Sequence, residues 1–302
     1  MDYSDVRYLL SKKPVDDRAL NRVVLSALGE ALGSRAAGGL SIVELGAGVG
    51  TMVARLADWH VIRSAEYTLV DRDAESLAAA RDHLNAWAAR AETTDQGWRV
   101  SADGATSDVR FIHSDAFVFL TAPDNHHRYD LVVANAVLDL MDLRPTLEQI
   151  WRAVKPGALY WFSINFDGET IFLPEAPLDE RVMRLYHRTM DERVRDGQPC
   201  GDSKTGRHLL EVIPKSGGSL LAAGSSDWVV FPSHGKYPAD EAYFLHHIVN
   251  TLWVALKDHP ELAGGDFERW IHTRHEQIEG AELIYIAHQL DVVGRAPGAA
   301  RA

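Results

Sequence analysis

The sequence lacks the disulfide pairs, long apolar runs and signal peptides that are typical of secreted and membrane proteins. Cys200 is the single cysteine among 302 residues, which excludes an intramolecular disulfide and a metal site built from several cysteines. No apolar run reaches the length of a transmembrane helix, and the N-terminus is polar and acidic rather than typical of a signal peptide. We therefore expect a cytoplasmic protein that makes no contact with a membrane.

Basic residues are also scarce. The chain has 31 lysines and arginines against 43 aspartates and glutamates, so its formal net charge is −12. Proteins that bind nucleic acid usually carry a basic surface, so we do not expect a nucleic-acid partner. The histidines lack the spacing of a distinctive metal motif, and we expect no resident metal. With 46% hydrophobic residues, the chain can form one large α/β domain with a cap, or two unequal domains.

The most informative segment is Leu40–Gly50, with the sequence LSIVELGAGVG. Its mostly apolar first half predicts a buried strand, and Gly46, Gly48 and Gly50 predict a tight turn that opens a helix. Glycines at such a turn let the backbone approach a ligand closely, because no Cβ stands between them. Units of this kind hold nucleotide-like ligands at the turn.

Polar residues follow the next three expected strands. Asp71 ends the second strand, where a carboxylate can accept hydrogen bonds from a ribose diol. Asp115 and Ala116 follow the third strand, and Asp115 can accept a hydrogen bond from the exocyclic amine of adenine. Asn135 ends the fourth strand, which we expect beside the glycine turn. These positions fit a ligand that contains adenosine.

Two classes of ligand compete for the turn. A dinucleotide site has the pattern G-x-G-x-x-G, but here the third glycine, Gly50, comes one residue early. Glu44 stands two residues before the turn, where a carboxylate would repel a pyrophosphate and attract an ammonium or sulfonium group. The pattern E-x-G-x-G-x-G therefore favours S-adenosylmethionine over NAD or FAD.

Over roughly residues 40–165 the chain resembles the class I S-adenosylmethionine-dependent methyltransferases. The resemblance implies an α/β fold, with a Rossmann-like seven-stranded methyltransferase sheet and helical cap insertions. It also implies an enzyme that transfers methyl groups. Eight residues are thereby expected to bind the cofactor: Glu44, Gly46, Gly48, Gly50, Asp71, Asp115, Ala116 and Asn135.

We expect four segments along the chain: an N-terminal helical lid (1–35), the cofactor-binding core (36–165), the rest of the sheet with helical cap insertions over the substrate (166–293), and a frayed tail (294–302). Helices are expected at 14–28, 51–59, 73–90, 144–154, 239–257 and 266–279. Strands are expected at 40–45, 67–71, 109–113, 129–135, 158–165, 227–231 and 282–290, the last one antiparallel, and residues 91–107 are expected to form a loop. The insertions can alternatively be structural decoration or an oligomer interface.

The segment 166–175, expected as a loop after the fifth strand, carries the candidate catalytic base. Glu169 in an aromatic and aliphatic setting would have a raised pKa and could take up a proton. Asp167 and Glu175 are competing carboxylates, and a solvated loop carboxylate is the alternative interpretation of Glu169.

The other candidates would hold the methyl acceptor. Phe172 and Trp228 can line an apolar pocket and stabilise a carbocation, or they can be ordinary core residues. Lys204 and Arg207, at the start of an expected helix, can grip a phosphate. Arg18 can hold either a phosphate or the carboxylate of the cofactor.

Three short segments resemble bacterial small-molecule methyltransferases, a group that includes enzymes C-methylating isoprenyl diphosphates: VDDRALN at 15–21, FDGET at 166–170 and SSDW at 225–228. This resemblance implies methylation of an alkene carbon of a prenyl diphosphate, with Glu169 as the base and Mg²⁺ carried in by the diphosphate. An O- or N-methyltransferase of a natural product stays open. A catalytically silent, cofactor-binding regulatory or assembly protein also stays open, as does a homo-oligomer.

Overall fold

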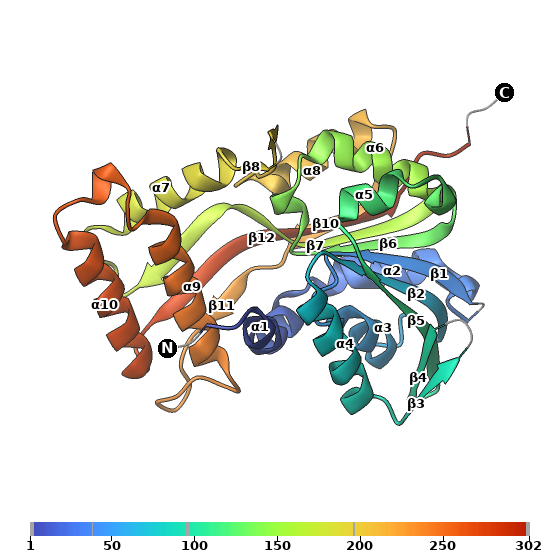
Figure 1. The fold of residues 1–302 in the computed structure, drawn as a ribbon, viewed down its shortest axis with the longest axis horizontal. Helices are drawn as coiled ribbons and strands as arrows, with labels where there is room; N and C mark the ends of the chain where they lie inside the picture. The colour runs from blue at the N-terminus through green and yellow to red at the C-terminus, as the bar shows by residue number, and fades with distance from the viewer. Residues whose placement is uncertain (1–2, 38, 95–96, 196, 300–302) are drawn as a thin grey trace.

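The centre of the molecule is a parallel sheet (Figure 1). The computed structural model describes residues 3–37, 39–94, 97–195 and 197–299. In this part of the chain the parallel strands are β1 (Leu40–Leu45), β2 (Ser64–Asp71), β5 (Ala105–His113), β6 (Tyr129–Asn135) and β7 (Val154–Leu173). β1 pairs with β2 on one side and with β6 on the other. The carboxyl ends of β1, β2 and β6 therefore meet at one edge, where the glycine turn begins.

Antiparallel strands extend this sheet at both ends. The hairpin of β3 (Arg90–Thr94) and β4 (Gly97–Ala102) pairs with β5. At the other end, β12 (Ile284–Arg295) pairs with β7, and β10 (Ser219–Ser225) pairs with β12. The order among the described residues is β10-β12-β7-β6-β1-β2-β5-β4-β3, and β11 (Trp228–Val230) pairs with the first part of β12.

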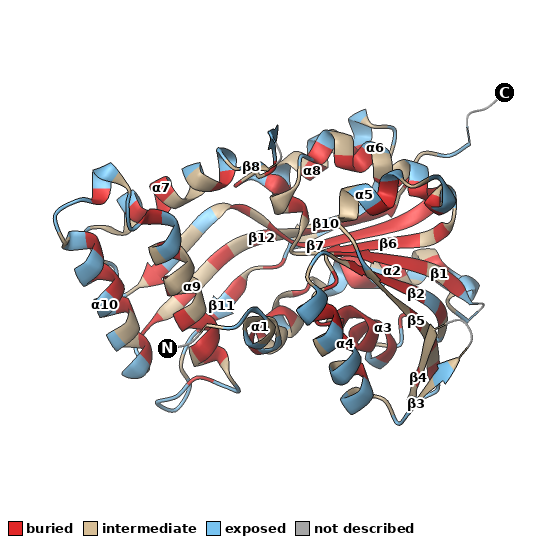
Figure 2. Cartoon of the chain, viewed as in Figure 1, coloured by how far each residue is buried: buried red, intermediate tan, exposed pale blue. Residues whose placement is uncertain are grey.

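Helices cover both faces of the sheet (Figure 1). One face carries α2 (Arg22–Leu32), α3 (Thr51–Asp58) and α4 (Ala74–Trp87), and the other carries α5 (Ala116–Thr121), α6 (Leu143–Ala153) and α8 (Thr205–Lys215). Alternation along β1 sends Ile42 into the hydrophobic cluster on the first side and Val43 into the cluster on the second. Figure 2 accordingly shows the central strands buried between two helical layers whose outer faces are exposed.

A cap of three helices lies beyond the end of β7. It contains α7 (Asp179–Asp191), α9 (Glu241–Leu256) and α10 (Asp266–Glu279), which pack around the far parts of β7, β11 and β12 (left in Figure 1). α1 (Asp5–Ala19) lies between the cap and the sheet, in contact with α9, β11 and α4. The core cluster on the α2–α4 side continues into the cap through Trp228, Phe244 and Trp270. The cap is thus joined to the sheet by continuous apolar packing.

The N-terminal helix differs from its prediction. A single helix over 14–28 is wrong, because Pro14 lies inside α1 and the chain bends at Leu20 and Asn21 before α2 begins. The Asn21 side chain accepts hydrogen bonds from the Val23 and Val24 N–H groups and so caps α2. The predicted helix over 14–28 includes Asn21, although asparagine is favoured as a capping residue.

Three strand predictions also need correction. Residues 91–107 form the β3–β4 hairpin and the start of β5 instead of a loop; Asp95 and Gln96 lie outside the described residues. β7 continues to Leu173, because Ile284–Ala287 of β12 pair with Thr170–Leu173, so the expected loop after Asn165 begins as a strand. β10 was not predicted, since its sequence SLLAAGS is mostly exposed and lacks β-branched residues. The other predicted helices, and the strand at 227–231, are present within a few residues.

The C-terminal strand β12 runs to Arg295, so the predicted frayed tail at 294–302 starts too early. Residues 300–302 of that tail lie outside the described residues. Within the described ranges, no helix combines the length and the apolarity that crossing a membrane requires.

Candidate active site

The glycine turn is built to admit a ligand. Gly46 and Gly48 have φ of +62° and +51°, the left-handed region that glycine adopts readily. A Cβ on Gly46 would come within 2.5 Å of Val137 Cγ2, and both glycines line a cavity at the head of β1. Gly50 lines neither of the cavities described below, and a Cβ there would lie 3.2 Å from the Ala80 Cβ. Gly50 therefore allows close packing of α3 against α4, and it does not line the cavities as its predicted contact with the cofactor requires.

Replacing Gly46 by alanine is expected to destabilise the protein by about 1–3 kcal/mol, because the new Cβ overlaps Val137 in a left-handed backbone. Urea denaturation measures this loss. Gly29→Ala is the matched control, since a Cβ at Gly29 meets no atom within 4 Å in the middle of α2. Equal stability of the two variants would contradict the strained turn.

Two cavities adjoin at this turn. The smaller, of about 90 Å³, is lined by Asp71, Asp115 and Ala116 among others, and the main cavity, of about 420 Å³, is lined by Glu44, Gly48 and Asn135 among others. Gly46 and Leu140 border both cavities. A ligand that crosses the turn would therefore place one end in each cavity.

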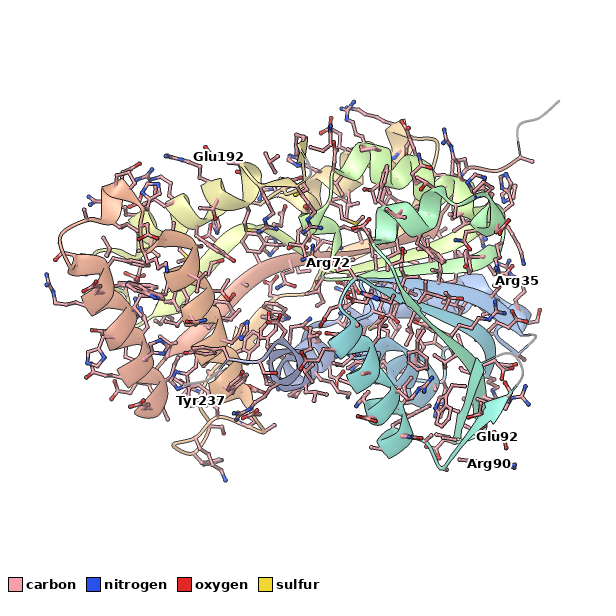
Figure 3. All side chains as sticks on the ribbon, viewed as in Figure 1. Arg35, Arg72, Arg90, Glu92, Glu192 and Tyr237 are labelled. Carbon is pink, nitrogen blue, oxygen red and sulfur yellow. The ribbon has the colours of Figure 1, made fainter. Side chains whose placement is uncertain are left out.

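Carboxylates shape the smaller cavity. Asp71 Oδ2 accepts the Gly48 N–H at 2.7 Å, which fixes the carboxylate against the turn. Asp115 Oδ1 accepts two backbone N–H groups of the first turn of α5, and no described group donates to its Oδ2. That free oxygen suits an exocyclic amine, as the sequence suggested. Arg72 also lines this cavity and lies at the centre of Figure 3, whereas Arg35, Arg90 and Glu92 lie far away at the edge of the sheet.

Glu44 supplies a buried carboxylate to the main cavity. It is 2% exposed, and its Oε2 accepts a hydrogen bond from the Tyr67 hydroxyl at 2.9 Å. Burial raises its pKa to about 8, against the opposing effects of the Tyr67 hydrogen bond and of Arg55. Asn135 lies beside it, held by the Ser163 hydroxyl at 2.9 Å. A cationic ligand would stabilise the ionised form of the buried Glu44 carboxyl group, whereas a pyrophosphate would be repelled by it. These residues therefore fit S-adenosylmethionine.

Aromatic residues line much of the main cavity. The α1 lid, the cap and the sheet each contribute rings: Tyr8, Phe166, Tyr186, Trp228 and Tyr285. Lys12 is the one lysine or arginine among the described lining residues, and its Nζ lies 2.8 Å from Asp16 Oδ2. Asp16 also accepts the Trp228 indole N–H at 2.9 Å. Among the described residues, the chamber therefore has no unpaired lysine or arginine to offer an anionic acceptor.

The structure does not bring the predicted base to this chamber. Glu169 is exposed and does not line the main cavity, so its predicted apolar setting is wrong. Phe166 and Thr170 line the cavity, whereas Asp167 binds Arg207 of α8. Glu169 lies between them in an irregular part of β7, where Gly168 has a φ of +80° and the pairing with β12 shifts register.

Four of the five predicted substrate residues lie outside the chamber. Phe172 is 2% exposed in the core against Trp270 and Tyr285. Arg18 makes a bidentate pair with Glu241 of α9, at 2.6 and 2.9 Å. Lys204 is exposed, and Arg207 Nε lies 2.8 Å from Asp167 Oδ1. Trp228 does line the main cavity, as expected.

Neither Asp139 nor Tyr186 was singled out from the sequence, although both line the main cavity. Asp139 lies in the short 3₁₀ helix Leu138–Leu140, four positions after the strand-ending Asn135, and lines the main cavity. A carboxylate so soon after the carboxyl end of a central strand was an available signal. Tyr8 and Tyr285 had no local signal, since the folding of α1 and β12 onto the cap brings them in. No cluster of three or more metal-ligating side chains occurs in the described ranges.

Comparisons with known proteins agree with this site. Residues 43–160 match a family model described as a methyltransferase domain. No curated protein sequence matches the chain. Similar solved structures include geranyl diphosphate C-methyltransferase from Streptomyces coelicolor A3(2), at 12% identity over 90% of this chain and 76% of that chain, with a TM-score of 0.43. A (4+2) cyclase, SpnF, is 16% identical over 96% and 81% of the two chains, with a TM-score of 0.41.

A third similar structure is phosphoethanolamine N-methyltransferase 2 from Haemonchus contortus, at 13% identity over 98% of this chain and 58% of that chain, with a TM-score of 0.45. These likenesses are remote, so they say nothing about the acceptor. The matched domain contains the glycine turn, Asp71, Asp115 and Asn135, all at the cavities described above. Residues 43–160 are therefore similar to a methyltransferase domain, and this similarity covers the part of the chain that carries the glycine turn.

Proposed function

We propose that the protein methylates a heteroatom of a small, largely apolar molecule that carries no phosphate. The observation that carries this proposal is the main cavity. The glycine turn and several aromatic residues line it together, and the one lysine among its described lining residues is already paired with Asp16. A volume of about 420 Å³ is that of a small-molecule site, which the methionine end of the cofactor would share with the acceptor.

Bound S-adenosylmethionine supplies a methyl group on a positively charged sulfur. The residues of the chain then have to hold, align and shield the reactants. Glu44 attracts the cationic end, Asp71 and Asp115 accept from the ribose and the adenine, and the α1 lid closes the chamber. Tyr8 and Trp228 line the chamber with aromatic side chains that suit an apolar acceptor.

A prenyl diphosphate is the less favoured acceptor. It would bring several negative charges into a chamber whose wall contains Glu44, Asp16 and Asp139. The cations that the sequence offered for phosphate, Lys204 and Arg207, do not line that chamber. Mg²⁺ would have to enter with the diphosphate, since the described residues hold no metal-binding cluster. We therefore favour O- or N-methylation of a natural product over C-methylation of an isoprenoid.

A mass-shift screen tests this proposal. The protein and S-adenosylmethionine are incubated with phenols, amines and prenyl diphosphates, with and without Mg²⁺, and products are scanned for a gain of one methylene unit. We expect products from phenols or amines and none from diphosphates. Methylated prenyl diphosphate would instead restore the isoprenoid hypothesis. Cofactor binding without turnover on any compound would favour a silent regulatory protein.

A further inference from the structure

Asp139 lies where the two cavities adjoin. Asp139 is among the residues that line the main cavity, and the next residue, Leu140, borders both cavities together with Gly46. A cofactor with adenosine in the smaller cavity and methionine in the main one must pass this junction, which places its sulfur near Asp139. Asn135 and Ala136, just before it in the chain, line the same part of the main cavity.

Two buried oxygen atoms at the main cavity have no donor. Within the described residues no group donates to Asp139 Oδ1, although solvent does not reach this atom, and the same is true of Gln289 Oε1. Gln289 is 2% exposed and lines the same cavity from β12. A buried acceptor without a donor costs free energy, so such atoms are usually satisfied by a ligand or by water. Because solvent does not reach either oxygen in this structure, a ligand in the main cavity would satisfy them only after a turn of the two side chains.

The surroundings of Asp139 raise the pKa of its carboxyl group. Burial raises its pKa to about 6; a hydrogen bond from its own backbone N–H, Arg193 and Lys12 oppose this shift, and Asp202 adds to it. The phenols of Tyr8 and Tyr186, on α1 and α7, are close enough to interact electrostatically with the carboxylate, and burial raises the pKa of each. At neutral pH the carboxylate is therefore ionised and able to accept a proton.

We infer that Asp139 is the general base of the methyl transfer, and that the acceptor is a hydroxyl- or amine-bearing molecule that also donates a hydrogen bond to Gln289. This inference rests on the proposed function and narrows its substrate class. For a hydroxyl acceptor, the Asp139 carboxylate takes the O–H proton while the oxygen forms a bond to the methyl carbon. The methyl–sulfur bond breaks, and its electron pair stays on the sulfur. A carboxylate and a sulfonium thus become a neutral acid and a neutral thioether.

Calorimetry tests the position of Asp139 without any acceptor. S-adenosylmethionine is titrated into the wild type and D139N at pH 6 in two buffers of different ionisation enthalpy. Because the pKa of Asp139 is about 6 and a nearby sulfonium favours the carboxylate, we expect the wild type to release up to about half a proton more than D139N. S-adenosylhomocysteine, with a neutral sulfur, should show no such difference. D142N is the matched control, because Asp142 is exposed and does not line the main cavity.

Turnover tests the chemical role. On phenols of high pKa, D139N is expected to lose about a hundredfold or more of kcat, and the loss should shrink for acidic phenols that are already ionised. D139E, which keeps a carboxyl group, should recover part of the rate. Equal proton release by wild type and D139N, an equal loss across the phenol series, or methylation of carbon acceptors alone would each overturn the inference. Absence of any heat with S-adenosylmethionine would instead overturn the proposed function itself.

Discussion

E44Q is expected to weaken S-adenosylmethionine binding by about a hundredfold or more, since removing one partner of a buried charge pair costs about 2–5 kcal/mol. Glu44 lines the main cavity together with Gly46 and Gly48, and it is 2% exposed. Glutamine keeps the shape and can still accept from the Tyr67 hydroxyl, so the change removes mainly the charge. Isothermal titration calorimetry measures the affinity directly.

The same variant should change the pH dependence of binding. Because the pKa of Glu44 is about 8, the carboxyl must lose a proton before it can pair with the cationic ligand at neutral pH. The association constant of the wild type should therefore rise with pH, by at most about tenfold per unit, and level off near pH 8. E44Q should lack this rise. E66Q is the control, because Glu66 is exposed and paired with Arg110 on the surface.

As the pH rises from 4.5 to 8, the contribution of Glu44 to the free energy of unfolding should fall, whereas the affinity for S-adenosylmethionine should rise. The folded protein holds the Glu44 proton up to a pKa of about 8, whereas an unperturbed carboxyl releases it near 4.5. The folded state binds more protons in that window, so this group lowers the free energy of unfolding as pH rises from 4.5 to 8. E44Q should consequently gain stability over the wild type across the same range. A variant that binds S-adenosylmethionine normally, or that loses stability at pH 8, would contradict the role of Glu44.

D16N is expected to lower the free energy of unfolding by about 3 kcal/mol or more, since breaking a buried ion pair leaves an uncompensated charge. Asp16 is 2% exposed and lies 2.8 Å from the Lys12 Nζ, and Arg55 Nη2 approaches it to 3.6 Å. Asparagine preserves the acceptor for the Trp228 indole but leaves Lys12 without a carboxylate in the cavity wall. Urea denaturation followed by circular dichroism measures the loss.

The matched control for D16N is another ion pair of α1. Arg7 and Asp240 lie 2.8 Å apart, with about half of each side chain exposed. Solvent screens such a pair, so D240N should cost less than about 1 kcal/mol. If D16N cost no more than D240N, the buried cluster would not be what holds α1 over the chamber.

The cofactor half of the site could be read from the sequence because its determinants are local. Gly46 and Gly48 follow a buried strand directly, and a parallel strand carries its last residue to the same edge as its neighbours. Asp71, Asp115 and Asn135 each end or follow such a strand, so their convergence needed no knowledge of the rest of the fold.

The acceptor half could not be read in this way. The structure places Phe166 and Thr170 at the cavity and leaves Glu169 exposed, in a part of β7 where the pairing with β12 shifts register. Arg18 forms an ion pair with Glu241, which lies 223 positions away in the sequence. Neither of these arrangements can be predicted from the local sequence.

The sequence by itself therefore determined the parallel sheet, the glycine turn and the carboxylates that suit a sulfonium cofactor. Only the tertiary structure decided which residues face the acceptor. Tyr8, Asp139, Tyr186 and Tyr285 come from α1, the segment after β6, α7 and β12, and they share a cavity only because the cap folds over the sheet. Local patterns fix strands and turns through short-range sterics and hydrogen bonds, whereas a cavity between distant segments depends on how their apolar faces pack.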